Sequence, residues 1–178
     1  MTDETRGALH HVELWVPDLG RARDEWGWLL ARLGYQDFQG WPDGCSWRRG
    51  TTYIVVEESP ALSGRTHDRN APGLNHLAFS AGTQREVDAL AAAAVEHGWR
   101  ELFPEKYPHA GGPDHFAAYL VNSDGFEAEL VATGRRRARR VLRWAPRPAQ
   151  RTIRRIRTGV PASSCSAVAP SGTKPLRR

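Results

Sequence analysis

The sequence predicts an α+β fold built from two copies of one βαβββ unit. Two segments have the pattern of a short strand followed by an amphipathic helix, and each begins with a histidine in its strand. The spacing repeats as well, because His11 lies 23 residues before Gly34 and His76 lies 22 residues before Gly98. A period near 65 residues indicates two fused half-domains and excludes short solenoid repeats.

The first unit begins with the strand pattern of residues 9–16, in which apolar side chains alternate with polar or aromatic ones. Pro17 breaks this strand, and Asp18 is a suitable N-cap for a helix with an apolar stripe that ends at Gly34. Three short strands are expected next, separated by glycine-rich and proline-rich turns. Their expected ranges are 35–39, 45–49 and 52–58.

The second unit repeats this order from residue 74 onward. A strand at 74–80 is followed by Thr83 and Glu86, which have the spacing of a capping box, and then by a helical apolar stripe. Asp124-Gly125 predicts a hairpin turn between the last two strands. The three strands after the helix are expected at 100–103, 116–122 and 126–132.

The domain organisation follows from these patterns. Residues 8–133 form one domain with modules at 8–58 and 74–133, and the Ser-, Gly- and Pro-rich residues 59–73 form the linker. Residues 134–178 form a basic tail that is expected to be mostly disordered.

Charge separates the tail from the domain. Of the 25 Lys and Arg residues, 14 lie in the tail, which has no Asp or Glu, so its formal charge is +14 and that of residues 1–133 is −9. A basic segment of this kind could contact an anionic membrane or nucleic acid, whereas the acidic domain does not favour nucleic-acid binding. The chain has no apolar stretch of membrane-spanning length and no secretory signal pattern, so a cytoplasmic location is expected.

Two equivalent strand histidines and a carboxylate on the last strand are a typical set of three metal ligands. His11 and His76 open the two units, and Glu127 and Glu129 share one face of the final strand. Such a facial set leaves open positions for a substrate on Fe(II) or a similar ion, whereas a carboxylate ligand also suits Mn, Ni, Zn or Mg. We therefore expect the site to bind a divalent metal ion, with Fe(II) favoured.

Three segments carry a family resemblance: Val16-Pro-Asp-Leu, Asn75-His-Leu-Ala-Phe, and the residues from Asn122 to Leu130, which read Asn-Ser-Asp-Gly-Phe-Glu-Ala-Glu-Leu. Together they resemble the vicinal oxygen chelate superfamily, which includes glyoxalase I, bleomycin-resistance proteins and extradiol dioxygenases. The resemblance implies two modules that form a cupped mixed sheet, with His11, His76 and Glu129 as metal ligands.

Tyr119 and the Asn122-to-Gly125 turn before Glu129 are similar to the extradiol dioxygenase signature, although Ser123 stands where that signature has proline. The resemblance implies that Tyr119 orients a substrate and that His109 or His115 acts as a general acid or base. His109 lies in a Gly- and Pro-rich loop of the kind that folds over a ligand.

A fourth ligand on the last strand of the first module would indicate a glyoxalase-like or epimerase-like site. Glu57 is the candidate, but the expected position lies nearer Val55, which cannot bind a metal. The leading hypothesis is therefore a metal-dependent enzyme that chelates vicinal oxygens of a small-molecule substrate, with dioxygenase-like chemistry favoured over isomerase or lyase chemistry. The alternative is a metal-free protein that binds or sequesters a small molecule, and a homodimer is compatible with either.

Overall fold

The computed structural model describes residues 6–134. The chain divides into two units, residues 1–139 and 140–178, and all described residues belong to the first. The predictions for the basic tail concern residues that, from 135 onward, lie outside the described part of the chain. Within the described part, no helix has the length and apolar character needed to cross a membrane.

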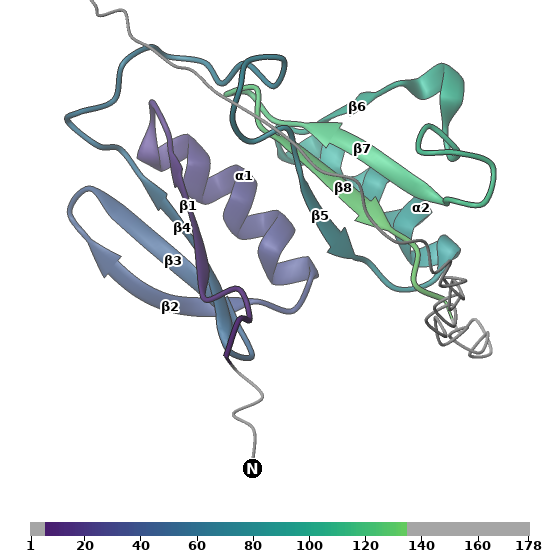
Figure 1. The fold of residues 1–178 in the computed structure, drawn as a ribbon, viewed down its shortest axis with the longest axis horizontal. Helices are drawn as coiled ribbons and strands as arrows, with labels where there is room; N and C mark the ends of the chain where they lie inside the picture. Colours follow the sequence, from purple (N-terminus) through teal and green to yellow (C-terminus); the bar gives the residue numbers. More distant parts are fainter. Residues whose placement is uncertain (1–5, 135–178) are drawn as a thin grey trace, which may run out of the picture. The chain divides into compact units, whose positions relative to one another are not determined.

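The first module has the predicted βαβββ order (Figure 1). Its sheet has the strand order β1-β4-β3-β2, in which β1 and β4 are parallel and the other pairs are antiparallel. Its elements are β1 (His11–Trp15), α1 (Leu19–Arg32), β2 (Gln36–Trp41), β3 (Gly44–Arg49) and β4 (Thr52–Glu57).

The second module repeats that topology with the order β5-β8-β7-β6. The parallel pair is now β5 and β8, so the duplication extends to strand direction. The predicted α+β class and the two βαβββ modules are confirmed. The elements are β5 (Leu77–Ser80), α2 (Gln84–Ala94), η1 (Val95–His97), β6 (Arg100–Leu102), η2 (Pro104–Lys106), β7 (Ala117–Val121) and β8 (Glu127–Val131).

The helix ends have the chemistry that the sequence predicts. Asp18 caps α1 by accepting a hydrogen bond from the backbone N–H of Arg21. Thr83 and Glu86 form the capping box of α2, each accepting a hydrogen bond from the other's backbone N–H. After α1 the chain turns at Gly34, whose φ of 84° lies in the left-handed region that favours glycine.

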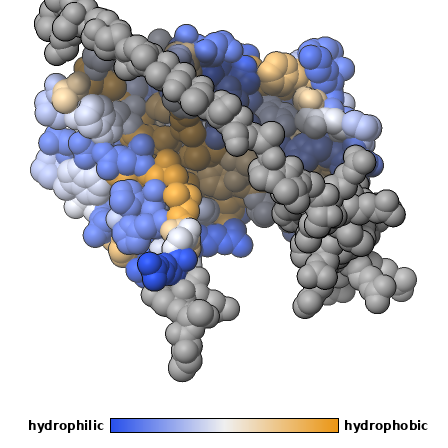
Figure 2. All heavy atoms as spheres, viewed as in Figure 1, coloured by the Kyte–Doolittle hydropathy of each residue, from blue (hydrophilic) through white to orange (hydrophobic). Residues whose placement is uncertain are grey.

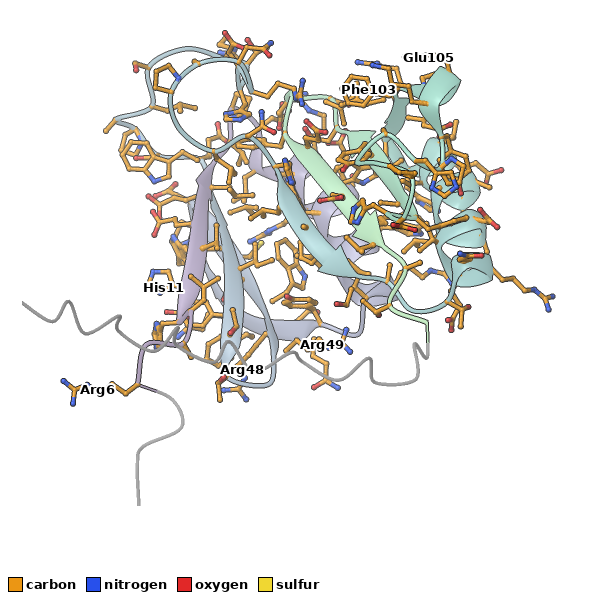
Figure 3. All side chains as sticks on the ribbon, turned by 45° about the vertical axis from the view of Figure 1, so that its right-hand side comes forward. Arg6, His11, Arg48, Arg49, Phe103 and Glu105 are labelled. Atoms are coloured by element: carbon orange, nitrogen blue, oxygen red, sulfur yellow. The ribbon has the colours of Figure 1, made fainter. Side chains whose placement is uncertain are left out.

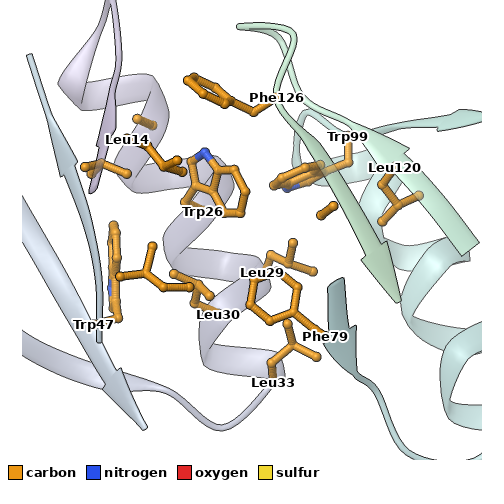
Figure 4. Close-up of a cluster of buried hydrophobic side chains, with 14 of the residues drawn as sticks. Leu14, Trp26, Leu29, Leu30, Leu33, Trp47, Phe79, Trp99, Leu120 and Phe126 are labelled. Atoms are coloured by element: carbon orange, nitrogen blue, oxygen red, sulfur yellow. The ribbon is translucent and has the colours of Figure 1, made fainter. Parts of the chain in front are cut away.

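Helix α1 lies between the strands of the two modules and contributes to one continuous core (Figure 4). The indole of Trp26 is fully buried and meets the ring of Trp99 edge to face, with centroids 4.9 Å apart. The Trp99 indole N–H also donates to the Glu25 carbonyl at 3.1 Å. Figure 2 shows the molecule from the same side as Figure 1, with hydrophobic residues in the centre of this face and hydrophilic ones around them.

The strand registers show which positions of the two modules correspond. In β1, Val12 and Leu14 face the helix, as Leu77 and Phe79 do in β5. Aligning these strands places His11 at the position equivalent to His76.

Candidate functional site

Glu129 is the centre of a polar cluster on the face of the second sheet opposite α2. It lies in the middle of β8 and its side chain is 8% exposed. His76 Nε2 lies 3.1 Å from one carboxylate oxygen, and His115 Nε2 lies 2.5 Å from the other. Each oxygen therefore has an imidazole partner, and the structure brings together three of the predicted site residues.

Strand pairing places Tyr119 beside this carboxylate. Tyr119 on β7 is the register partner of Glu129 on β8. Burial raises the pKa of the Tyr119 phenol, and its interaction with the Glu129 carboxylate raises it further. The phenol is therefore held protonated at neutral pH, as a hydrogen-bond donor towards the carboxylate or a ligand.

Glu129 stays ionised although it is buried. Burial acts to raise its pKa, but the interactions with Tyr119, His115 and His76 outweigh burial and bring the pKa below its ordinary value. An ionised carboxylate with two imidazole neighbours can accept a proton, orient a histidine or ligate a cation.

The ring of His76 is oriented by its neighbour in sequence. His76 Nδ1 lies 2.8 Å from the Asn75 side-chain oxygen, which leaves Nε2 directed at Glu129. Asn75 in turn donates from its amide nitrogen to the carbonyl of Arg69 at 2.9 Å. The linker between the modules is thereby connected to the site.

The loop before β7 closes over the cluster. A Cβ atom on Gly111 would lie 2.5 Å from the His115 ring and 2.8 Å from the Tyr119 hydroxyl oxygen, so the glycine permits a close approach. His109 is exposed, and its Nδ1 lies 3.2 Å from the carbonyl of His115. His109 therefore contacts the backbone of the site and not the Glu129 carboxylate.

His11 lies apart from this cluster. Its ring stacks on Tyr53 with centroids 4.9 Å apart, and its Nδ1 lies 2.9 Å from Nδ1 of His10. Figure 3 shows His11 beside β1 at the left of the view, well separated from Phe103, a neighbour of Tyr119, at the top. Within residues 6–134, no group of three or more His, Cys, Asp or Glu side chains is arranged to hold a metal ion.

The registers also locate the position where a fourth ligand would lie. Glu13 pairs with Val55 in the first module, and its counterpart Ala78 pairs with Glu129 in the second. Val55 is therefore the equivalent of Glu129, and Glu57 is the equivalent of Val131. The first module has valine where the second has its central carboxylate.

The pair formed by His76 and Glu129 fits a divalent ion in donor type and separation. Two adjacent ligands about 2.1 Å from one ion lie about 3.0–3.4 Å apart, and the facing atoms of this pair are 3.1 Å apart. The third predicted ligand, His11, is not in reach of the pair within one chain.

Sequence reasoning missed an ion pair beside the cluster. Glu127, two residues before Glu129 on β8, is fully buried and bonded to the guanidinium of Arg69. The parity of β8 places Glu127 on the same face as Glu129, but Arg69 lies in a linker without periodicity, so no pattern connects the two residues.

Comparison with known proteins yields consistent matches. The family described as the glyoxalase/bleomycin resistance protein/dioxygenase superfamily matches residues 10–119. The uncharacterized protein YqjT of Bacillus subtilis (strain 168) is 40% identical over 126 residues, which cover 70% of this chain and 98% of YqjT.

Solved structures of related proteins also match this chain. A candidate glyoxalase from Bacillus halodurans has 39% identity and a TM-score of 0.68, covering 72% of this chain and 97% of its own. A glyoxalase/bleomycin resistance protein from Albidiferax ferrireducens T118 has 23% identity and a TM-score of 0.57, covering 70% and 97%. The second match supports the fold alone.

Proposed function

Since the chain belongs to the glyoxalase/bleomycin resistance protein/dioxygenase superfamily, we propose that it is a metal-dependent enzyme acting on a small molecule with two adjacent oxygens. The observation that carries the proposal is the Glu129 carboxylate held between His76 and His115. Dioxygenase-like chemistry is favoured because Tyr119 faces this carboxylate and Val55 occupies the position where a fourth ligand would lie.

In this proposal each residue has a distinct role. His76 and Glu129 would hold the ion, which would supply positive charge beside the two substrate oxygens. Tyr119 donates a hydrogen bond to a substrate oxygen, since a phenol is protonated at neutral pH and burial raises its pKa further. His115, whose Nε2 faces a Glu129 oxygen, donates a proton to the substrate or accepts one from it, and the Gly111 loop covers His115 and Tyr119.

The third ligand in the proposal is His11 from a second copy of the chain. His11 is exposed on β1, an edge strand of the first sheet, and the equivalent histidine lies just before β5, an edge strand of the second. A two-fold dimer in which these edges meet would form two identical sites, each with residues from both chains.

The test is the metal content of the purified full-length chain after loading with Fe(II) or Mn(II). We expect about one ion per chain, and loss of the ion in His76→Ala and in His11→Ala. Mixing the two variant chains would restore about one quarter of the sites, because half of randomly paired dimers would hold one intact site of two. His97→Ala, a substitution away from the cluster, is the control, and retention of metal by His76→Ala would contradict the proposal.

A metal-free binding protein is the second candidate. It is favoured by the finding that no three-ligand group exists within residues 6–134 of a single chain. It predicts that small-molecule ligands bind with equal affinity before and after treatment with a chelator.

A further inference from the structure

The ion pair between Arg69 and Glu127 lies beside the site but has no part in the proposed chemistry. The Glu127 side chain is 0% exposed, and one of its carboxylate oxygens accepts from Arg69 Nε. Its other oxygen has no hydrogen-bond partner among the described residues. Because a buried charge is costly without a partner, Arg69 is the group that makes this glutamate tolerable.

Glu127 accepts a hydrogen bond from the Nε of Arg69, and the two terminal nitrogens of the guanidinium remain able to donate to a ligand. The bond to Glu127 is made by Nε, and within residues 6–134 neither terminal nitrogen of Arg69 donates a hydrogen bond. The Arg69 side chain is 28% exposed, so solvent or a ligand can reach it. A guanidinium held on one edge by a buried carboxylate offers its other N–H groups in the geometry that binds a second carboxylate.

An aromatic ring and a second cation surround this guanidinium. Arg69 Cζ and Lys106 Nζ each lie 5.6 Å from the centroid of Phe103. The same ring lies 6.0 Å from that of Tyr119, edge to face. Two cations thus lie close to the Phe103 ring, which in turn meets Tyr119, the register partner of Glu129.

Phe103 adopts a backbone conformation that a phenylalanine seldom does. Its φ is 57° and its ψ is 45°, in the left-handed region. For a bulky residue this conformation costs about 1 kcal/mol or more, and such strain is concentrated at functional sites. In this conformation the Phe103 ring lies close to both Arg69 and Tyr119.

The position of Arg69 is coupled to that of the site histidine. Asn75 donates to the Arg69 carbonyl at 2.9 Å, and its side-chain oxygen lies 2.8 Å from His76 Nδ1. One asparagine therefore fixes both the linker that carries Arg69 and the ring that faces Glu129.

We propose that Arg69 binds a carboxylate on the substrate and that Phe103 and Tyr119 pack against a flat, unsaturated body attached to it. The substrate class is then an aromatic or conjugated carboxylic acid. This inference rests on the proposed function for the reaction, but binding of the carboxylate requires no metal.

The experiment compares benzoate with benzamide, which has nearly the same shape and no charge. Dissociation constants are measured by NMR titration of the chelator-treated full-length chain. We expect benzoate to bind about tenfold more tightly than benzamide, the usual size of a charge-assisted hydrogen-bond contribution. Arg69→Lys should reduce this preference by weakening benzoate several-fold while changing benzamide less than twofold, because lysine keeps the charge but lacks the planar fork.

Two further variants test whether the effect of Arg69→Lys is specific to the Arg69 charge. Arg69→Gln combined with Glu127→Gln removes both charges, avoids an unpaired buried glutamate, and should abolish the preference for benzoate. Arg65→Lys, an exposed arginine in the same linker, should leave both ligands unaffected.

Equal binding of the two probes by the native chain, or an unchanged benzoate preference in Arg69→Lys, would overturn the proposal. Metal content separates the two hypotheses. An Arg69-dependent preference in a chain that takes up no metal refutes the proposed enzyme alone, whereas normal metal uptake without the preference refutes the carboxylate site alone.

Discussion

The two modules agree closely on the faces that pack against the helices and differ on the opposite faces. On the helix side, Leu14 corresponds to Phe79 and both are buried. On the opposite side, Val55 corresponds to Glu129, and Tyr53 corresponds to Glu127. The second module thereby has a pair of carboxylates where the first has apolar and aromatic side chains.

In this duplicated half-domain, one face of each sheet serves packing and the other differs between the modules. Packing against a helix constrains every second residue of a strand and preserves the fold. The residues between them are not constrained in this way, and here the second module has a carboxylate site while the first has an aromatic surface around Tyr53 and Phe38. His11 and His76 are the exception, because both modules retain a histidine there.

The largest effect on stability is expected when the equivalent core residues Leu14 and Phe79 are each replaced by alanine. Leu14→Ala and Phe79→Ala should each lower the free energy of unfolding by about 2–5 kcal/mol, because each removes a buried side chain and leaves a cavity. Glu13→Ala, on the opposite face of β1 and exposed, should change it by less than about 0.5 kcal/mol. Urea denaturation measures all three, and a large loss in Glu13→Ala would contradict the assignment of faces.

A smaller effect is expected from adding a methyl group to a glycine in each module. Gly111→Ala should destabilise the chain by about 1–3 kcal/mol, since its Cβ would overlap the His115 ring and the Tyr119 hydroxyl. Gly40→Ala in β2 meets nothing within 4 Å and should be neutral. Thermal unfolding compares them, and similar melting temperatures would show that the loop does not lie on the site.

The smallest effect concerns the helices, because α1 buries a glutamate that has no counterpart in the buried residues of α2. Burial raises the pKa of Glu25 above its ordinary value of 4.5, although a hydrogen bond from the Ser123 N–H opposes the shift. The folded state therefore holds this proton more tightly than the unfolded state, and stability is lost as pH rises through the raised pKa.

Glu25→Gln should remove that loss, so the variant should be more stable relative to the native chain at pH 7.5 than at pH 4. Urea denaturation at the two pH values measures the difference. A constant difference between the two chains would indicate that Glu25 has its ordinary pKa.

Much of the fold was predictable because each element has its own local signal. Asp18 and the Thr83 capping box marked the helix starts, and the alternation in β1, β5 and β8 marked the strand faces. The pairing of His76 with Glu129 was also predictable, since β5 and β8 belong to one module and are adjacent in its sheet.

Features that depend on the path of the chain between modules were not predictable. Alternation gave the face of His11 but not its distance from the second module, and the structure places it against Tyr53. Arg69 had no local signal because its partner Glu127 is 58 residues away and the linker has no periodic pattern. The equivalence of Val55 and Glu129 depends on how β4 and β8 pair with β1 and β5, and strand pairing is not contained in a local pattern.

The position of α1 has a consequence for synthesis. One side of α1 can be covered as soon as the first sheet forms, but Trp26 also needs Trp99 and Phe126, which leave the ribosome about 70 and 100 residues later. During that interval the nascent first module exposes an apolar helix surface. A ribosome stalled between the modules should therefore recruit chaperones that bind apolar segments, and release them once β8 has emerged.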